Sequence, residues 1–279
     1  MNIGIFDSGF GGLTIFKSIR NSLPQYDYIY LGDNARTPYG SRSFDAIFRF
    51  SKECIDHLFA RGCKVVVIAC NTASAKALRT LQQKVLPVEY PDRKVLGIIR
   101  PSAEALADYP RSRSVALWAT EGTVKSQSFV LELEKLAPGL RLVQKACPLL
   151  VPMVEAGELD GPGIEHYIGK YWRETLTLAD GNPGAAGTEG IGALLLACTH
   201  YPLLYPKIRA IVPAKVDILV QGNIVAPSLV DYLVRHPEVE GELSRNGSQR
   251  FLTTDQTEGF DRLSEVFLGH PVISEKVEI

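Results

Sequence analysis

The sequence predicts an α/β protein made of two similar α/β domains, each with a mostly parallel central sheet. Short apolar runs alternate with helix-length segments along the whole chain. Such runs are typical of parallel strands that helices cover on both faces. A length of 279 residues fits about two domains. Two pairs of similar segments also recur in the two halves of the chain.

The first half begins with strands and helices in strict alternation. We expect strands at 3–7, 28–31, 64–69 and 95–99 and helices at 11–20, 44–60 and 73–85. In the second half we expect strands at 114–118, 140–145 and 192–197 and helices at 123–136, 148–155, 163–178 and 201–211. The last part predicts strands at 216–220, 249–253 and near Val272, with helices at 224–234 and 256–267.

The order of these elements predicts a discontinuous first domain. We expect residues 1–99 and 217–279 to form one α/β domain and residues 100–216 to form the second. The strand at 216–220 should then pair with the sheet of the first half. The glycine-rich segment from Asp180 to Gly190 is interpreted as a surface loop within the second domain.

Composition excludes several classes of protein. Hydrophobic residues make up 46% of the chain, which excludes an intrinsically disordered or collagen-like protein. A net charge of -1 argues against a nucleic-acid binder that works by phosphate neutralisation. No apolar run approaches the ~18 residues that span a bilayer, and the N-terminus has no signal-peptide pattern. We therefore expect a cytoplasmic protein with reduced cysteines and no membrane partner.

The recurring segments point to two cysteines. VVVIACNTA (65–73) and ALLLACTHY (193–201) each have an apolar strand, Ala-Cys, a polar pair and a helix start. IGIFDSGFGG (3–12) and SVALWATEGT (114–123) also share one layout. Ligands of open α/β sheets bind beyond the carboxyl ends of the strands. Cys70 and Cys198 are therefore expected to line one interdomain active-site cleft from opposite sides.

The surroundings of these two thiols suggest chemistry. A helix N-terminus lowers the pKa of a thiol, and Cys70 and Cys198 each stand where a strand ends and a helix begins. His200 is a candidate acid or base beside Cys198, and Asp7 is either a turn-capping residue or a carboxylate near one thiol. The other cysteines are interpreted as buried small apolar residues, namely Cys54, Cys63 and Cys147.

No cofactor or metal is expected. A zinc site from Cys70, Cys198 and His200 is conceivable, but the chain has no C-x-x-C pair. A dinucleotide fingerprint would need Gly at position 14, where Thr14 stands, and there is no GxxxxGK[ST] stretch. The glycines Gly9, Gly11 and Gly12 instead suggest a close approach of the backbone to a small anion.

Six motifs taken together resemble the glutamate racemase family, within the cofactor-independent aspartate/glutamate racemase superfamily. They occur in the family's order between positions 7 and 204. The motifs are DSGFGGLT (7–14), LGDNARTPYG (31–40), ACNTAS (69–74), TEGTV (120–124), CPLLVPMVE (147–155) and ACTHYPLL (197–204).

The resemblance implies roles for individual residues. Cys70 and Cys198 match the family's catalytic thiols, and Asp7 and His200 match the groups that assist them. Asp33 and Glu155 match further acidic groups near the active site. The resemblance implies substrate contacts at Asp7, Ser8, Tyr39, Gly40, Asn71, Thr72, Thr199 and His200. It also implies a homo-oligomer, expected to be a dimer, and D-glutamate supply for peptidoglycan.

The expected reaction is two-base racemisation of glutamate. One thiolate removes the α proton from one face while the opposite thiol returns a proton. By resemblance, Cys70 with Asp7 acts on the D-form and Cys198 with His200 on the L-form. Two alternatives stay open: an aspartate racemase, whose substrate is one methylene shorter, and a non-catalytic amino-acid-binding regulator on the same fold.

The chain departs from the family pattern at three places. Gln221-Gly222-Asn223 stands where relatives usually have an acidic Asp-Ser stretch, and Arg100-Pro101 stands where Glu usually precedes the proline. The loop from Asp180 to Gly190 is longer than usual. We expect these departures to affect domain packing, oligomer contacts or regulation.

Overall fold

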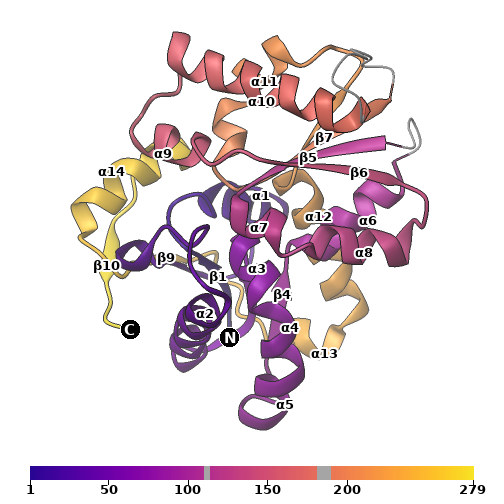
Figure 1. Ribbon diagram of the computed structural model, residues 1–279. Coiled ribbons are helices and arrows are strands. Elements are labelled where there is room, and N and C mark those ends of the chain that lie inside the picture. The colour runs from indigo at the N-terminus through magenta and orange to yellow at the C-terminus, as the bar shows by residue number, and fades with distance from the viewer. Residues whose placement is uncertain (110–113, 181–189) are drawn as a thin grey trace. The chain divides into compact units, whose positions relative to one another are not determined.

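A computed structural model of the chain describes residues 1–109, 114–180 and 190–279 (Figure 1). These residues form two compact α/β units, Met1–Ile99 with Gly222–Ile279 and Arg100–Gln221. Apart from its two end residues, the predicted loop from Asp180 to Gly190 lies outside the described residues.

The first unit contains a six-stranded sheet in which every neighbouring pair of strands is parallel. The strand order is β10-β9-β2-β1-β3-β4. The strands are β1 (Asn2–Asp7), β2 (Tyr28–Gly32), β3 (Cys63–Ile68), β4 (Lys94–Gly97), β9 (Gln249–Thr253) and β10 (Ser274–Lys276). The central strands β1, β2 and β3 are buried along nearly their whole length, which explains their continuous apolar sequence.

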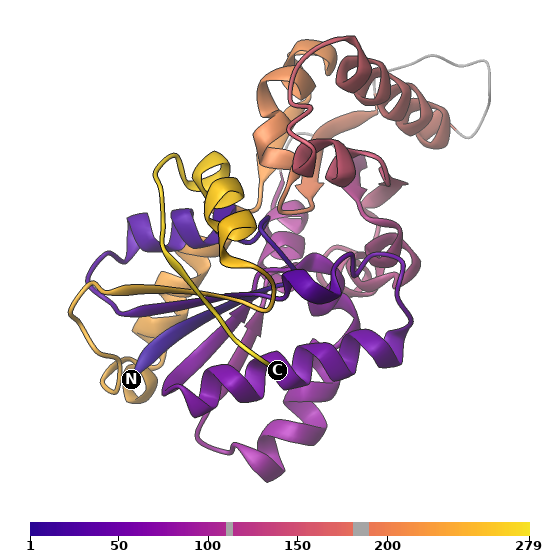
Figure 2. The same cartoon turned by 90° about the vertical axis from the view of Figure 1, so that its left-hand side faces the viewer.

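Helices cover both faces of this sheet (Figure 2). The helical segments are α1 (Leu13–Ser22), η1 (Asn34–Arg36), α2 (Phe44–Ala60), α3 (Asn71–Lys76), α4 (Leu78–Thr80), η2 (Leu81–Val85), α5 (Leu86–Glu89), α12 (Gly222–Arg235), α13 (Pro237–Glu240) and α14 (Thr257–Leu268). Helix α1 packs against α12 and α14, whereas α2 packs against β1, β2 and β3. Gly222 permits the first of these contacts, because a Cβ there would lie 2.4 Å from the Ser18 hydroxyl oxygen.

The second unit contains a four-stranded parallel sheet with the order β6-β5-β7-β8. Its strands are β5 (Ser114–Ala119), β6 (Arg141–Ala146), β7 (Ile191–Ala197) and β8 (Asp217–Val220). Its helical segments are α6 (Ile99–Ala107), α7 (Glu121–Lys125), α8 (Ser128–Leu136), α9 (Leu150–Glu155), α10 (Pro162–Asp180), η3 (Tyr201–Leu204) and α11 (Tyr205–Ile211). The predicted α/β class with parallel sheets is therefore confirmed.

The two sheets share one topology. The order β2-β1-β3-β4 in the first unit corresponds to β6-β5-β7-β8 in the second. Even the irregularity in pairing recurs, between Asn2 and Ile3 of β1 and between Ser114 and Val115 of β5. Strand β3 leads to Cys70 and its counterpart β7 leads to Cys198. The internal symmetry predicted from the sequence is thus present in the strand order.

Three predicted elements differ from the structure. The strand expected to return to the first sheet was assigned wrongly, because β8 pairs with β7 and the chain re-enters the first unit only at Gly222. The single helix expected at 123–136 is broken by Gln127, which has a left-handed φ of 55°. The helix expected at 73–85 begins earlier and is divided into α3, α4 and the π-helical η2.

Among the described helices, none is both long and apolar enough to cross a membrane.

Candidate active site

The turn after β1 buries a carboxylate at the edge of the first sheet. Asp7 is fully buried, and its Oδ2 accepts a hydrogen bond from the Gly9 amide at 3.0 Å. The Tyr30 hydroxyl lies beside it and donates to the Gly9 carbonyl at 2.9 Å. A Cβ on Gly12 would lie 2.4 Å from the Cβ of Asp7 and 2.9 Å from the Tyr30 hydroxyl. Glycine at position 12 therefore makes room for the chain's own carboxylate.

Cys70 follows the adjacent strand β3 and caps helix α3. Its Sγ accepts a hydrogen bond from the Ala73 amide at 3.4 Å, and its thiol donates to the Ser8 hydroxyl oxygen at 3.4 Å. The thiol is nearly buried, with 6% of the residue exposed. The sulfur therefore both accepts and donates at the start of helix α3. The buried residues Asn71 and Thr72 form the start of the same helix.

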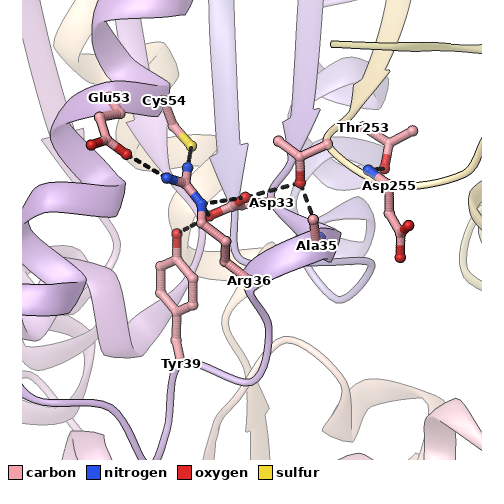
Figure 3. A network of polar contacts seen from close by, with 9 residues as sticks. Asp33, Ala35, Arg36, Tyr39, Glu53, Cys54, Thr253 and Asp255 are labelled. Carbon is pink, nitrogen blue, oxygen red and sulfur yellow. Dashed lines mark hydrogen bonds and ion pairs between the residues drawn. The ribbon is translucent and has the colours of Figure 1, made fainter. Parts of the chain in front are cut away.

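Asp33 and Tyr39 lie in the segment that follows β2. The Asp33 amide donates to the Asp7 carbonyl at 3.0 Å, which places this segment next to the turn after β1. The Asp33 carboxylate accepts from Arg36 and from the Tyr39 hydroxyl (Figure 3). The first unit thus brings Asp7, Ser8, Cys70 and Asp33 to the carboxyl ends of three adjacent strands, where open parallel sheets bind ligands.

The second unit assembles a thiol, an imidazole and a carboxylate. Cys198 follows β7, and its Sγ lies 4.0 Å from Nδ1 of His200. The other ring nitrogen of His200, Nε2, lies 3.0 Å from Oε1 of Glu155 at the end of α9. Cys198, Thr199 and His200 are all at most 6% exposed. Glu155, expected only near the site, directly contacts the predicted acid–base residue.

The charge on His200 is set by these two neighbours. Burial alone lowers the pKa of an imidazole, but contacts with Cys198 and Glu155 outweigh it and raise the pKa of His200 from 6.5 to about 10. At neutral pH the ring is therefore an imidazolium. The site thus places a cation 4.0 Å from Sγ of Cys198.

The three remaining cysteines are fully buried in the protein core. Cys54, Cys63 and Cys147 are 0% exposed, as the sequence predicts. Burial raises the pKa of all three thiols, and that of Cys63 reaches about 12. Over the described part of the chain, no group of three or more His, Cys, Asp or Glu side chains is arranged to hold a metal ion.

Comparison with known proteins identifies the family. Residues 13–224 match the family model described as Asp/Glu/Hydantoin racemase. The chain is 37% identical to a glutamate racemase of Sulfurihydrogenibium over 100% of its length and 98% of that protein. The chain therefore belongs to the Asp/Glu/hydantoin racemase family, and the resemblance predicted from its motifs is confirmed.

Solved structures agree with this assignment. Glutamate racemase isoform RacE1 from Bacillus anthracis superimposes with a TM-score of 0.88 and 30% identity, covering 100% of this chain and 97% of that one. A glutamate racemase from Francisella tularensis, solved in complex with D-glutamate, gives a TM-score of 0.85 at 30% identity, with 99% and 97% coverage.

Sequence reasoning missed the residues that support these side chains. Tyr30 reads as an ordinary strand residue, and Thr254 lies more than 200 positions from its partner Asp33. Arg36 stands inside the motif LGDNARTPYG and is the only one of the three with a local signal. A buried carboxylate such as Asp33 needs a nearby cation, and that requirement could have singled out Arg36.

Proposed function

We propose that this chain is a glutamate racemase that interconverts L- and D-glutamate with Cys70 and Cys198 as its two acid–base groups. The observation that carries the proposal is the equivalence of the two thiols. Each follows the same strand of a shared topology, and each has its own polar partner. The solved structure with D-glutamate and the named relatives support glutamate as the substrate.

The proposed reaction conserves protons in each turnover. One thiolate takes the α proton and becomes a thiol, while the opposite thiol protonates the other face of the carbanion and becomes a thiolate. An ordinary thiol pKa of about 8.5 is close to neutral, so modest stabilisation of the thiolate suffices. The α proton is far less acidic, so hydrogen-bond donors around the carbanion must contribute much of the rate.

The two thiols have different assistants in this proposal. Cys70, with Asp7 and Ser8 nearby, acts on D-glutamate, and Cys198, with the His200 imidazolium, acts on L-glutamate. The raised pKa of His200 supports the second half, because it keeps a protonated imidazole 4.0 Å from Sγ of Cys198. We assign glutamate contacts to Asp7, Ser8, Tyr39, Gly40, Asn71, Thr72, Thr199 and His200.

The substrate assignment is tested by racemisation of single enantiomers. We expect D- and L-glutamate to racemise with no added cofactor and with a metal chelator present. The same assay on D- and L-aspartate tests the competing aspartate racemase. Faster turnover of aspartate, or a strict need for pyridoxal phosphate, would overturn the proposal, and no turnover of either amino acid would favour a binding protein.

The two-thiol mechanism is tested by serine replacements. We predict that Cys70→Ser and Cys198→Ser each reduce racemisation by at least about 10³-fold, because an alcohol is a far weaker acid than a thiol. A substrate analogue with a leaving group on the β carbon eliminates after one deprotonation. Cys70→Ser should eliminate only from the L-analogue and Cys198→Ser only from the D-analogue. Elimination from the same enantiomer by both variants would contradict the assignment.

We also infer a cellular role and an assembly state from the family. D-glutamate made by this enzyme would supply bacterial peptidoglycan synthesis in the cytoplasm, and the enzyme would act as a homodimer. Rescue of a D-glutamate auxotroph by the parent, but not by Cys70→Ser, tests the role. Light scattering of the purified protein tests the dimer.

A further inference from the structure

The Asp33 carboxylate is fully committed to neighbouring groups of the chain. The residue is 0% exposed and follows directly after β2. Arg36 Nε donates to Oδ1 at 2.9 Å and to Oδ2 at 2.7 Å. The Tyr39 hydroxyl also donates to Oδ2, and the Thr254 hydroxyl donates to Oδ1 at 2.9 Å. Both carboxylate oxygens thus accept hydrogen bonds, and through them Asp33 fixes the conformation of this segment (Figure 3).

Arg36 extends this network to helix α2. Its Nη1 pairs with the carboxylate of Glu53, and its Nη2 lies 3.3 Å from Sγ of Cys54. The guanidinium also lies over the Phe50 ring, 4.5 Å from the ring centre. A planar guanidinium suits this role because its donors point in fixed directions to several acceptors at once. Arg36 therefore ties the segment after β2 to three residues of one helix.

The opposite side of the segment is fixed to the end of β9. The Ala35 amide donates to the Thr254 hydroxyl at 3.0 Å, and the Thr253 hydroxyl donates to Oδ1 of Asn34 at 3.0 Å. The Thr254 amide donates to the Gly32 carbonyl at 3.2 Å. The turn η1 is thus held between helix α2 and the end of strand β9, and Asp33 contacts both sides.

Tyr39 is also held by this network. Its hydroxyl faces Asp33, and its ring packs against Phe6 and Phe50, with ring centres 6.4 Å and 5.9 Å away. The residue is only 2% exposed. Because the Tyr39 phenol is buried and bound to Asp33, it is not available to a ligand. A ligand contact at Tyr39 and Gly40 would therefore use the main chain.

We propose that Arg36 is a positioning residue that acts on substrate binding through Asp33 and Tyr39. By binding the buried Asp33 carboxylate, Arg36 holds the acceptor of the Tyr39 hydroxyl in place, and this contact holds the main chain at Tyr39 and Gly40 against the substrate. This inference rests on the proposed function, since glutamate is the ligand that Tyr39 and Gly40 are proposed to contact. Without Arg36, the Asp33 carboxylate would lose the contacts of Nε with both of its oxygens and would no longer be fixed to helix α2.

The test separates binding from chemistry with graded variants. Tyr39→Phe keeps the packed ring and removes only the hydroxyl, and Arg36→Gln removes the cation. We expect each to raise KM for glutamate about tenfold, with kcat within about twofold, as expected when a contact contributes equally to substrate and transition state. Arg36→Lys keeps the positive charge but lacks the planar guanidinium, so its KM should lie between those of the parent and Arg36→Gln.

A matched control is available on helix α2. Lys52 pairs with Asp56 and Glu89 at 2.8 Å and 2.7 Å, and its side chain is 26% exposed, against 20% for Arg36. Lys52→Gln therefore removes a comparable ion-pair network that does not touch residues 33–40. The KM of Lys52→Gln should stay within about twofold of the parent.

The equal free energy of the two enantiomers gives an internal check on every variant. Because the equilibrium constant is one, kcat/KM must fall by the same factor in both directions.

The outcomes distinguish this inference from the function beneath it. An active parent whose Tyr39→Phe variant keeps its KM within about twofold would overturn the positioning role alone, even where Arg36→Gln fails to fold. A fall in kcat at unchanged KM in Tyr39→Phe would also overturn it, by showing a role in the chemical step. A parent that does not racemise glutamate would overturn the proposed function and this inference together.

Discussion

At the scale of single residues, His200 has an unusual proton affinity with a definite pH consequence. Its pKa is raised from 6.5 to about 10 because contacts with Cys198 and Glu155 outweigh the effect of burial. The folded protein therefore holds this proton more tightly than the unfolded chain. The stabilisation is fully present below about pH 6.5 and is lost as the pH rises through about 10.

We predict that Glu155→Gln shifts the alkaline limit of L-glutamate turnover to lower pH. Without the carboxylate 3.0 Å from Nε2, the pKa of His200 falls toward 6.5, and the imidazolium that we propose assists Cys198 is lost at lower pH. The measurement is kcat for L-glutamate against pH in the parent and the variant.

The control for this prediction is another carboxylate of the same unit. Glu165 pairs with Lys207 at 2.9 Å on the surface, and Glu165→Gln should leave the pH profile unchanged. An alkaline limit that does not move in Glu155→Gln would contradict a role for the protonated His200 in turnover.

At the scale of elements, the turn from β1 to α1 is shaped around one carboxylate. Gly12 lies where any side chain would overlap Asp7, because the Cβ-to-Cβ distance would be 2.4 Å. Such a contact cannot be relieved by rotating a flexible side-chain end. Either the carboxylate or the start of α1 must move.

We predict that Gly12→Ala destabilises the protein by about 1–3 kcal/mol and lowers kcat. The lost activity follows from displacement of Asp7, which we propose assists Cys70. Thermal unfolding and racemisation rates measure the two effects. Gly259→Ala is the control, because a Cβ at this position in α14 meets nothing within 4 Å and should be neutral or stabilising. Equal effects of the two substitutions would contradict the overlap.

The sequence predicted which segments form strands better than it predicted which strands pair. The strands next to Asp7, Cys70 and Cys198 could be predicted because their apolar runs are buried on both faces. The pairing of Asp217–Val220 could not, since its half-buried residues suit the edge of either sheet. The break at Gln127 depends on one left-handed residue within an otherwise helical pattern.

The support of the candidate site was also beyond the sequence for a physical reason. Thr254 reaches Asp33 because β9 pairs with β2, and that register is fixed only in the folded sheet. The motif LGDNARTPYG marks Arg36 as part of a segment without saying which acceptors it meets. Chemistry-bearing residues at strand ends were thus predictable, whereas the contacts that orient them needed the structure.

At the scale of the whole molecule, the same strand order occurs twice and each copy carries one of the two thiols. Strands β1, β2, β3 and β4 correspond to β5, β6, β7 and β8, so Cys70 and Cys198 occupy equivalent places in two units. Their local partners nevertheless differ: Ser8 contacts Cys70, and His200 contacts Cys198. The repeated layout fixes where the thiols lie, and we propose that the different neighbours give the two thiols their different roles.

We predict that alkylation distinguishes these two thiols from the other three. At neutral pH, iodoacetamide should label Cys70 and Cys198, which are 6% and 5% exposed, and spare the fully buried cysteines, whose pKa values burial raises. Peptide mass spectrometry locates the label, and activity should fall in parallel with it. Saturating glutamate should slow the labelling. Equal labelling of all five cysteines in the folded protein would contradict the prediction.

The attachment of Asp33 to Thr254 also has a consequence for synthesis. The two residues are 221 positions apart in the chain. A ribosome that adds ~5–20 residues per second needs roughly 10–45 seconds to cover that distance. For all of that time, the segment carrying Tyr39 and Gly40 waits for the strand that anchors it. Both thiols are present once residue 198 is added, and Thr254 follows 56 residues later, after roughly 3–11 seconds at the same rate. We therefore expect this segment to be fixed only after the C-terminal part of the chain is made.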